Sequence, residues 1–171
     1  MATFRKDMLG KTGGHAVGQI NSWNYDTVIN GALVTEATGI DNFTLGELHY
    51  TGGVQSVKQA TAGAEAEDMV LIATPEERLE GEPLENFYNA KDEMAKCVIL
   101  SQNLEFQTSA VATVESVNIG DKMIWDATAK KFKKDDDSVA TAKKVFRVVE
   151  IEKDEFYSID GKTLVALRVI K

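Results

Sequence analysis

The sequence predicts a mainly β protein, a barrel or sandwich of short strands with one short α-helix near residues 84–96 and an extended N-terminal arm. Three observations lead to this prediction. Short runs of apolar and β-branched residues recur along the chain and are separated by turn-forming residues. A single stretch has helical periodicity. The first twenty residues contain four glycines and no regular apolar period.

The composition fits one folded domain with an arm attached. The chain has 171 residues, of which 43% are hydrophobic, enough to bury a substantial core. We expect residues 1–30 to form the Gly-containing arm and residues 31–171 to form a single β-rich domain. The single cysteine excludes an internal disulfide. The sequence has no apolar run long enough for a signal peptide or a membrane helix.

The charge of the chain is acidic and unevenly distributed. Lys and Arg number 19 against 27 Asp and Glu, which gives a net charge of −8. Residues 31–95 carry thirteen acidic and three basic side chains, a net charge of −10, whereas residues 1–30 are slightly basic. This balance argues against nucleic acid as the main partner and against an anionic membrane surface.

The expected strands follow the arm, and their boundaries are set by glycine, proline and turn dipeptides. Residues 69–74 form a continuous apolar run that Pro75 ends, which is typical of a buried strand. A turn at 118–121 predicts a hairpin, and Asp160-Gly161 predicts a closing hairpin near the end of the chain. In order, the expected strands are 31–35, 54–60, 69–74, 97–101, 111–117, 122–125, 131–133, 145–151 and 163–170.

The expected helix rests on one amphipathic stretch. Pro83 suits a first helical position, and Lys96 suits the negative end of the helix dipole. One face of this stretch would contain Leu84, Phe87, Tyr88, Lys91 and Met94.

The segment Gly10-Lys11-Thr12 is reminiscent of the end of a phosphate-binding loop, but its context excludes one. That loop needs a glycine where this chain has Arg5, and a buried strand before it, for which too few residues are available. The glycines that follow Thr12 discourage the helix that the loop requires. We interpret the segment as part of the arm.

The residues that could carry chemistry are few and isolated. His15 and His49 lack the spacing of a zinc site or a catalytic triad, and Cys97 lies in an apolar run typical of a buried structural thiol. Asp135-Asp136-Asp137 follows four lysines and does not match a calcium loop. The acidic run at 76–85 is typical of a solvated surface. We expect no enzyme activity, no metal and no cofactor.

The arm carries large apolar side chains without the period of a helix or a strand. Such groups must be buried somewhere, either on the domain of the same chain or on another subunit, and both alternatives stay open. In the second case the aromatic residues would be anchors and the basic residues would pair with acidic groups. The candidate contact residues are Phe4, Arg5, Lys6, Lys11, Trp23 and Tyr25.

Three segments resemble a known family. They are the start Asn30-Gly31-Ala32-Leu33-Val34, the segment Asp68-Met-Val-Leu-Ile-Ala-Thr-Pro-Glu76, and the turn Val117-Asn-Ile-Gly-Asp121. Together with the order of the elements between residues 30 and 125, they resemble the head decoration proteins of tailed bacteriophages, also called auxiliary or cement proteins. None of these segments is a catalytic motif.

The resemblance implies a structural role. Proteins of that family are β-rich, bind the outside of an expanded capsid and bridge its subunits. The implied partner is the major capsid protein, with neighbouring copies of the chain itself, for example in a trimer, as a further contact. The implied location is the capsid exterior of the virion, after synthesis in the cytoplasm of the bacterial host. The arm contacts named above follow from the arm's composition and not from a family motif.

Three alternatives remain. A tail tube subunit would also be β-rich with extended arms, and it would assemble into rings by itself. A glycan-binding module on the virion surface would stack sugars on Trp125 or Tyr157. An enzyme is the third class, and it would depend on Cys97, His15 or His49.

Overall fold

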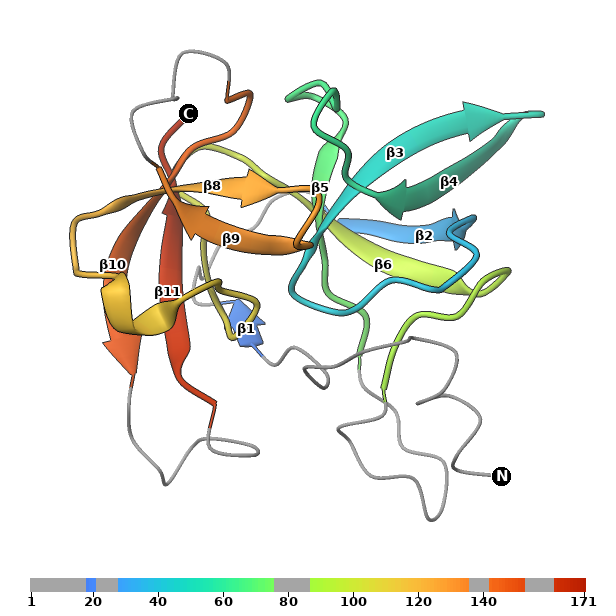
Figure 1. Cartoon of the computed structure of the whole chain (residues 1–171). Coiled ribbons are helices and arrows are strands. Elements are labelled where there is room, and N and C mark those ends of the chain that lie inside the picture. Colours follow the sequence, from blue (N-terminus) through green and yellow to red (C-terminus); the bar gives the residue numbers. More distant parts are fainter. Residues whose placement is uncertain (1–17, 21–27, 76–86, 136–141, 153–161) are drawn as a thin grey trace.

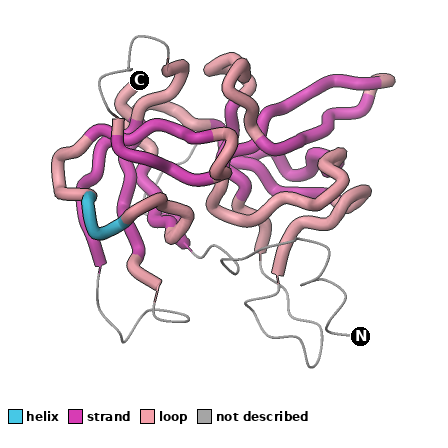
Figure 2. The backbone as a smooth tube through the Cα atoms, viewed as in Figure 1, coloured by secondary structure: helices cyan, strands magenta, loops and turns pink. Residues whose placement is uncertain are grey.

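The computed structural model describes residues 18–20, 28–75, 87–135, 142–152 and 162–171. Within these residues the chain forms a closed five-stranded barrel and a six-stranded sheet that lie side by side (Figure 1). Strands and the loops that join them make up nearly all of this structure (Figure 2). The predicted mainly β fold is therefore confirmed.

The barrel is built from strands that are close in sequence. Its order is β2-β4-β3-β5-β6, and pairing between β2 and β6 closes it. Strands β2 and β4 run parallel, and the other neighbours run antiparallel. Its strands are β2 (Val28–Val34), β3 (Leu45–Thr51), β4 (Val54–Gln59), β5 (Met69–Ile72) and β6 (Met94–Ile99).

The six-stranded sheet is antiparallel and has the order β1-β7-β11-β10-β8-β9. The predicted closing pair of strands is confirmed as β10 and β11. The strands of the six-stranded sheet are β1 (Gly18–Ile20), β7 (Glu105–Thr108), β8 (Lys122–Asp126), β9 (Lys131–Lys134), β10 (Phe146–Glu152) and β11 (Leu164–Val169).

Strand β5 is the wall that the barrel and the sheet share. Its side chains alternate, so Val70 and Ile72 enter a core inside the barrel, whereas Met69 and Leu71 enter a larger core beneath the sheet. All four residues are buried. Burial on both faces explains why this strand is a continuous apolar run in the sequence.

Three phenylalanines form the centre of the larger core. Phe106, Phe132 and Phe146 come from β7, β9 and β10, and all three are fully buried. Phe132 lies 5.8 Å from Phe106 and 5.1 Å from Phe146, measured between ring centroids. Tilted and edge-to-face contacts at these distances add to the gain from burying apolar area.

Strand β1 brings part of the predicted arm into the sheet. It pairs with β7, with Gly18 opposite Thr108. A Cβ atom on Gly18 would lie 1.9 Å from the carbonyl oxygen of Gln107 and 2.7 Å from Cγ of Phe43, so only glycine fits this position. The rest of residues 1–27 lies outside the described residues.

The predicted helix over 84–96 is wrong for residues 87–96, and residues 84–86 lie outside the described part. Asn89 forms a β-bridge with Ile40, and its Nδ2 also donates to the carbonyl oxygen of Ile40 at 3.0 Å. Asp92 has a left-handed backbone, with φ of 66°, and β6 begins at Met94. These tertiary hydrogen bonds outweigh a helical periodicity of only a few residues. The described residues contain no α-helix.

The predicted strand over 111–117 is also wrong. Val111 makes a single bridge to Phe132, and Thr113 has a left-handed backbone, with φ of 53°. The following residues form the 3₁₀ turn η2 (Val114–Ser116). The turn at 118–121 is present, and the Asp121 amide donates to the carbonyl oxygen of Asn118 at 3.1 Å. The turn does not form the predicted hairpin, because β8 pairs with β9 and β10 and not with residues 111–117. The sequence patterns do not predict strands β1, β3 and β7.

We predict that Phe132→Ala lowers the free energy of unfolding by about 3–5 kcal/mol, because it opens a cavity where three aromatic side chains meet. Ile119→Ala is the control, since the Ile119 side chain is 68% exposed, and it should change stability by less than about 0.5 kcal/mol. Urea unfolding followed by tryptophan fluorescence measures both. Equal effects of the two substitutions would contradict this core.

Candidate interaction surfaces

The contact residues predicted in the arm lie outside the described residues. These are Phe4, Arg5, Lys6, Lys11, Trp23 and Tyr25. Strand β1 lies between Lys11 and Trp23 in the sequence, and it fixes this part of the chain to the edge of the sheet beside β7.

Cys97 and His49 both lie on strands of the barrel. The Cys97 thiol is fully buried inside the barrel, and burial raises its pKa to about 12. His49 lies on β3, half-buried, with Nε2 3.5 Å from Oε1 of Glu47. No group of three or more His, Cys, Asp or Glu residues within the described ranges could hold a metal ion. His15, Asp136 and Asp137 lie outside those ranges.

Trp125 belongs to the core of the sheet. Its ring lies 5.2 Å from that of Phe132, and Nε1 donates to the carbonyl oxygen of Ala60 at 3.1 Å. The ring is half-buried, and these contacts cover part of it. Tyr157, the other residue considered for glycan binding, lies outside the described residues.

The hairpin of β3 and β4 presents two large apolar side chains to solvent. Tyr50 is 73% exposed and Val54 is 48% exposed. They lie beside the turn at Gly52-Gly53, where both φ angles are positive, as a two-residue hairpin turn requires. The end of this hairpin projects away from the six-stranded sheet (Figure 1). We call Tyr50 and Val54 the hairpin tip.

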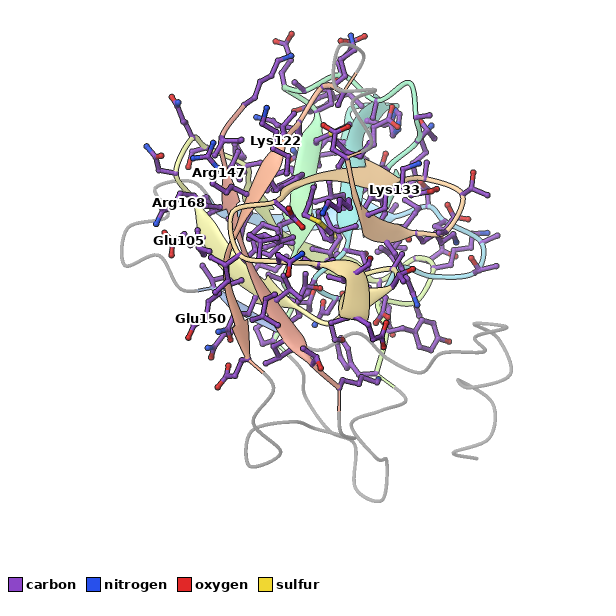
Figure 3. All side chains as sticks on the ribbon, turned by 60° about the vertical axis from the view of Figure 1, so that its left-hand side comes forward. Glu105, Lys122, Lys133, Arg147, Glu150 and Arg168 are labelled. Carbon is purple, nitrogen blue, oxygen red and sulfur yellow. The ribbon has the colours of Figure 1, made fainter. Side chains whose placement is uncertain are left out.

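A second surface crosses the outer face of the six-stranded sheet. Arg147 on β10 lies opposite Lys122 on β8 and opposite Arg168 on β11. All three side chains are exposed. We call Lys122, Arg147 and Arg168 the cation row. In Figure 3 the labels of these residues and of Glu105 follow one line across the strands.

Glu105 ends this row on β7. It lies opposite Arg168, whose Nε donates to Oε1 of Glu105 at 2.6 Å and whose Nη2 lies 2.5 Å from the same oxygen. The inward neighbours along the strands, Met123, Val148 and Leu167, belong to the larger core. The cation row therefore faces away from the barrel.

The sequence contained signs of both surfaces. The dipeptide Gly52-Gly53 is typical of a two-residue hairpin turn. Tyr50 and Val54 stand close to it on either side, so the pattern indicates apolar side chains near an exposed turn. Arg147 and Arg168 each stand between two buried residues, which is the alternation of a half-buried strand. The alignment of three cations on different strands depends on strand register, which the sequence pattern does not reveal.

Two comparisons with known proteins give matches over almost the whole chain. The model of the YonC prophage protein family matches residues 11–170. A relative from Bacillus subtilis (strain 168), the SPbeta prophage-derived uncharacterized protein YonC, is 35% identical over 182 aligned positions, covering 100% of this chain and 99% of the relative. Among the described residues, no helix is long and apolar enough to span a membrane.

We predict that the Cys97 thiol does not react with 5,5′-dithiobis(2-nitrobenzoate) at pH 8 while the protein is folded, because a thiol with a pKa of about 12 stays protonated there. In urea the thiol should react fully. The folded state keeps a proton that the unfolded state loses above the ordinary pKa of 9.0, so stability should fall as pH rises above 9. Rapid labelling of the native protein would show that the barrel opens around Cys97.

Proposed function

The chain belongs to the YonC prophage protein family, and we propose that it is a structural protein of the phage particle that binds the outside of the capsid and stabilises it by bridging capsid subunits. The observation that carries the proposal is the hairpin tip. It presents an aromatic and an aliphatic side chain on a rigid support, in a protein of a prophage family.

The hairpin suits contact with another protein because little of it has to become ordered on binding. Six residue pairs hold β3 against β4, from Gly46 opposite Gln59 to Thr51 opposite Val54. A tyrosine has few rotatable bonds and contributes a large contact area, so it loses little side-chain entropy for each contact that it makes.

Binding across the joint between capsid subunits would add buried area where internal pressure pulls them apart. Because the sites repeat over a symmetric shell, a modest affinity at each site stabilises the whole particle. The proposal keeps the major capsid protein as the partner. It also keeps the aromatic and basic side chains of residues 1–30 as further capsid contacts. On this proposal the protein acts on the capsid exterior and has no enzymatic step.

The edges of the sheet favour this function over that of a tail tube subunit. Strand β9 is one edge, and its sequence is Lys-Phe-Lys-Lys. Lysines on an edge strand oppose pairing with the edge of another sheet. A ring formed by joining β9 of one copy to β1 of the next would bring these lysines into the joint between subunits.

We predict that the purified protein cosediments with phage heads that lack it, and raises the temperature at which those heads release their DNA. Tyr50→Ser combined with Val54→Ser should weaken binding by roughly 30-fold, the effect of losing a contact of about 2 kcal/mol. Ile119→Ser is the matched control, because it removes an exposed apolar side chain from another site and should bind normally.

If the wild-type protein does not bind such heads, the proposed function is wrong. If the Tyr50 and Val54 variant binds as well as the wild type while its circular dichroism is unchanged, the hairpin tip is not the contact.

We also predict that deleting residues 1–17 leaves every described strand in place, because β1 begins at Gly18. The midpoint of urea unfolding should stay the same, whereas binding to heads should weaken because the aromatic and basic side chains of that segment are lost. A deletion that extends to residue 28 is not equivalent, since it removes β1 and the first residue of β2. Normal binding after removal of residues 1–17 would restrict the capsid contact to the rest of the chain.

A further inference from the structure

The charges of the described residues are divided between the two halves of the fold. Segments 28–75 and 87–100, which contain the barrel, carry eight acidic and three basic side chains, a net charge of −5. Segments 101–135, 142–152 and 162–171, which contain all of the sheet except β1, carry seven acidic and eleven basic side chains, a net charge of +4. The charge of the described residues is therefore divided between an acidic barrel half and a basic sheet half, although the whole chain is acidic.

The cation row concentrates the positive charge at one place. Directly opposite residues on antiparallel strands have Cβ atoms about 4.5–5.5 Å apart, and like charges there destabilise the sheet. Glu105 neutralises Arg168 at one end. The side chains of Lys122 and Arg147 make no ion pair or hydrogen bond with another described residue. The row thus opposes folding of its own sheet and leaves two cations available to a partner.

A complementary acidic surface lies at the end of the barrel. The turns that follow β2 and precede β6 are joined there, because the Val34 amide donates to the carbonyl oxygen of Glu93 and the Asp92 amide donates to that of Val34, both at 2.9 Å. These turns bring together Glu36, Asp92 and Glu93, which we call the acidic end. Figure 1 shows β2 ending and β6 beginning on the side of the barrel away from β10 and β11.

The acidic end also has an apolar neighbour. Met94 follows Glu93 directly and is 58% exposed. Asp92 and Glu93 are exposed, and Glu36 is half-buried. A contact here would combine charge pairing with burial of a flexible apolar side chain, which adapts to the surface that it meets.

We propose that copies of this chain associate head to tail, with the cation row of one copy against the acidic end of the next. The two surfaces lie on opposite sides of the same molecule, so the contact is heterologous and builds rings or chains rather than a closed two-fold dimer. This inference rests on the proposed function, because the capsid is where neighbouring copies of the chain would meet. On a capsid, neighbouring copies are held close together, and contacts between solvent-exposed charges become effective at such local concentrations.

A second copy fits the cation row better than nucleic acid does. The row ends in Glu105, and Glu150 lies farther along β10 on the labelled face (Figure 3). A nucleic-acid duplex lying on this face would be repelled by those carboxylates and by the net negative charge of the chain. A carboxylate-bearing turn can instead pair with the guanidinium of Arg147 through two parallel hydrogen bonds.

Two charge-reversed variants test the proposal on the purified full-length chain. The first, Lys122→Glu with Arg147→Glu, reverses the row and leaves the Arg168–Glu105 pair intact. The second, Glu36→Lys with Asp92→Lys, reverses the acidic end. A lysine is tolerated at position 92, where φ is 66°, because Lys130 already adopts φ of 53° in this protein. The matched control, Lys130→Glu with Lys131→Glu, makes the same change in net charge outside the row.

Sedimentation velocity at several hundred micromolar protein and low ionic strength should show the wild type and the control at masses above that of one chain, returning to one chain in high salt. Each reversed variant alone should stay a single chain. An equal mixture of the two should again form assemblies larger than a dimer. The glutamate row of the first variant pairs with the lysine end of the second, and the intact cation row of the second pairs with the intact acidic end of the first, so the two variants alternate head to tail.

Three results would overturn the proposal: a wild type that stays a single chain, a reversed variant that still associates, or a duplex DNA that binds the wild type and not the variant with the reversed row. Because self-association is measured without capsids, its failure would leave the proposed capsid binding standing. Failure to bind heads would likewise leave the self-association result unchanged.

Discussion

Packing of the inner face of the six-stranded sheet against one wall of the barrel is the interaction on which the rest of this structure depends. Leu45, Leu71 and Val98 of the barrel meet Phe106 and Leu167 of the sheet in one continuous core. Burial of apolar area on this scale supplies most of the driving force for folding. Because β5 contributes its other face to the barrel interior, one strand joins the two cores, and separation of the sheet from the barrel would expose Met69 and Leu71.

Polar contacts at the margins set how the barrel and the sheet are oriented. Thr108 of β7 donates through Oγ1 to the carbonyl oxygen of Phe43 at 2.9 Å, and Lys144 donates to the carbonyl oxygen of Leu100 at 2.9 Å. Such hydrogen bonds add little net stability each, but they are directional. With the core between them, the hairpin tip and the cation row are left facing outward on different sides, which is why one chain can present two separate contact surfaces.

The sequence predicted the elements that local pattern determines and missed those that depend on distant partners. Alternation of buried and exposed residues identified β10 and β11, and an unbroken apolar run identified β5. The predicted helix is wrong because Asn89 bonds to Ile40, 49 positions away, and Tyr88 beside it is buried without a helix. The cation row could not be predicted, because Lys122, Arg147 and Arg168 meet only through the register of three strands. The arm contacts remain predictions.

We propose that the chain is a structural part of the phage particle and acts through its surfaces and not through a catalytic centre. Quantitative mass spectrometry of purified virions, giving the number of copies of this chain for each major capsid protein, tests that claim most directly. The account predicts a fixed ratio close to one, or another simple fraction set by the capsid lattice. Absence of the chain from virions that are otherwise complete would contradict it.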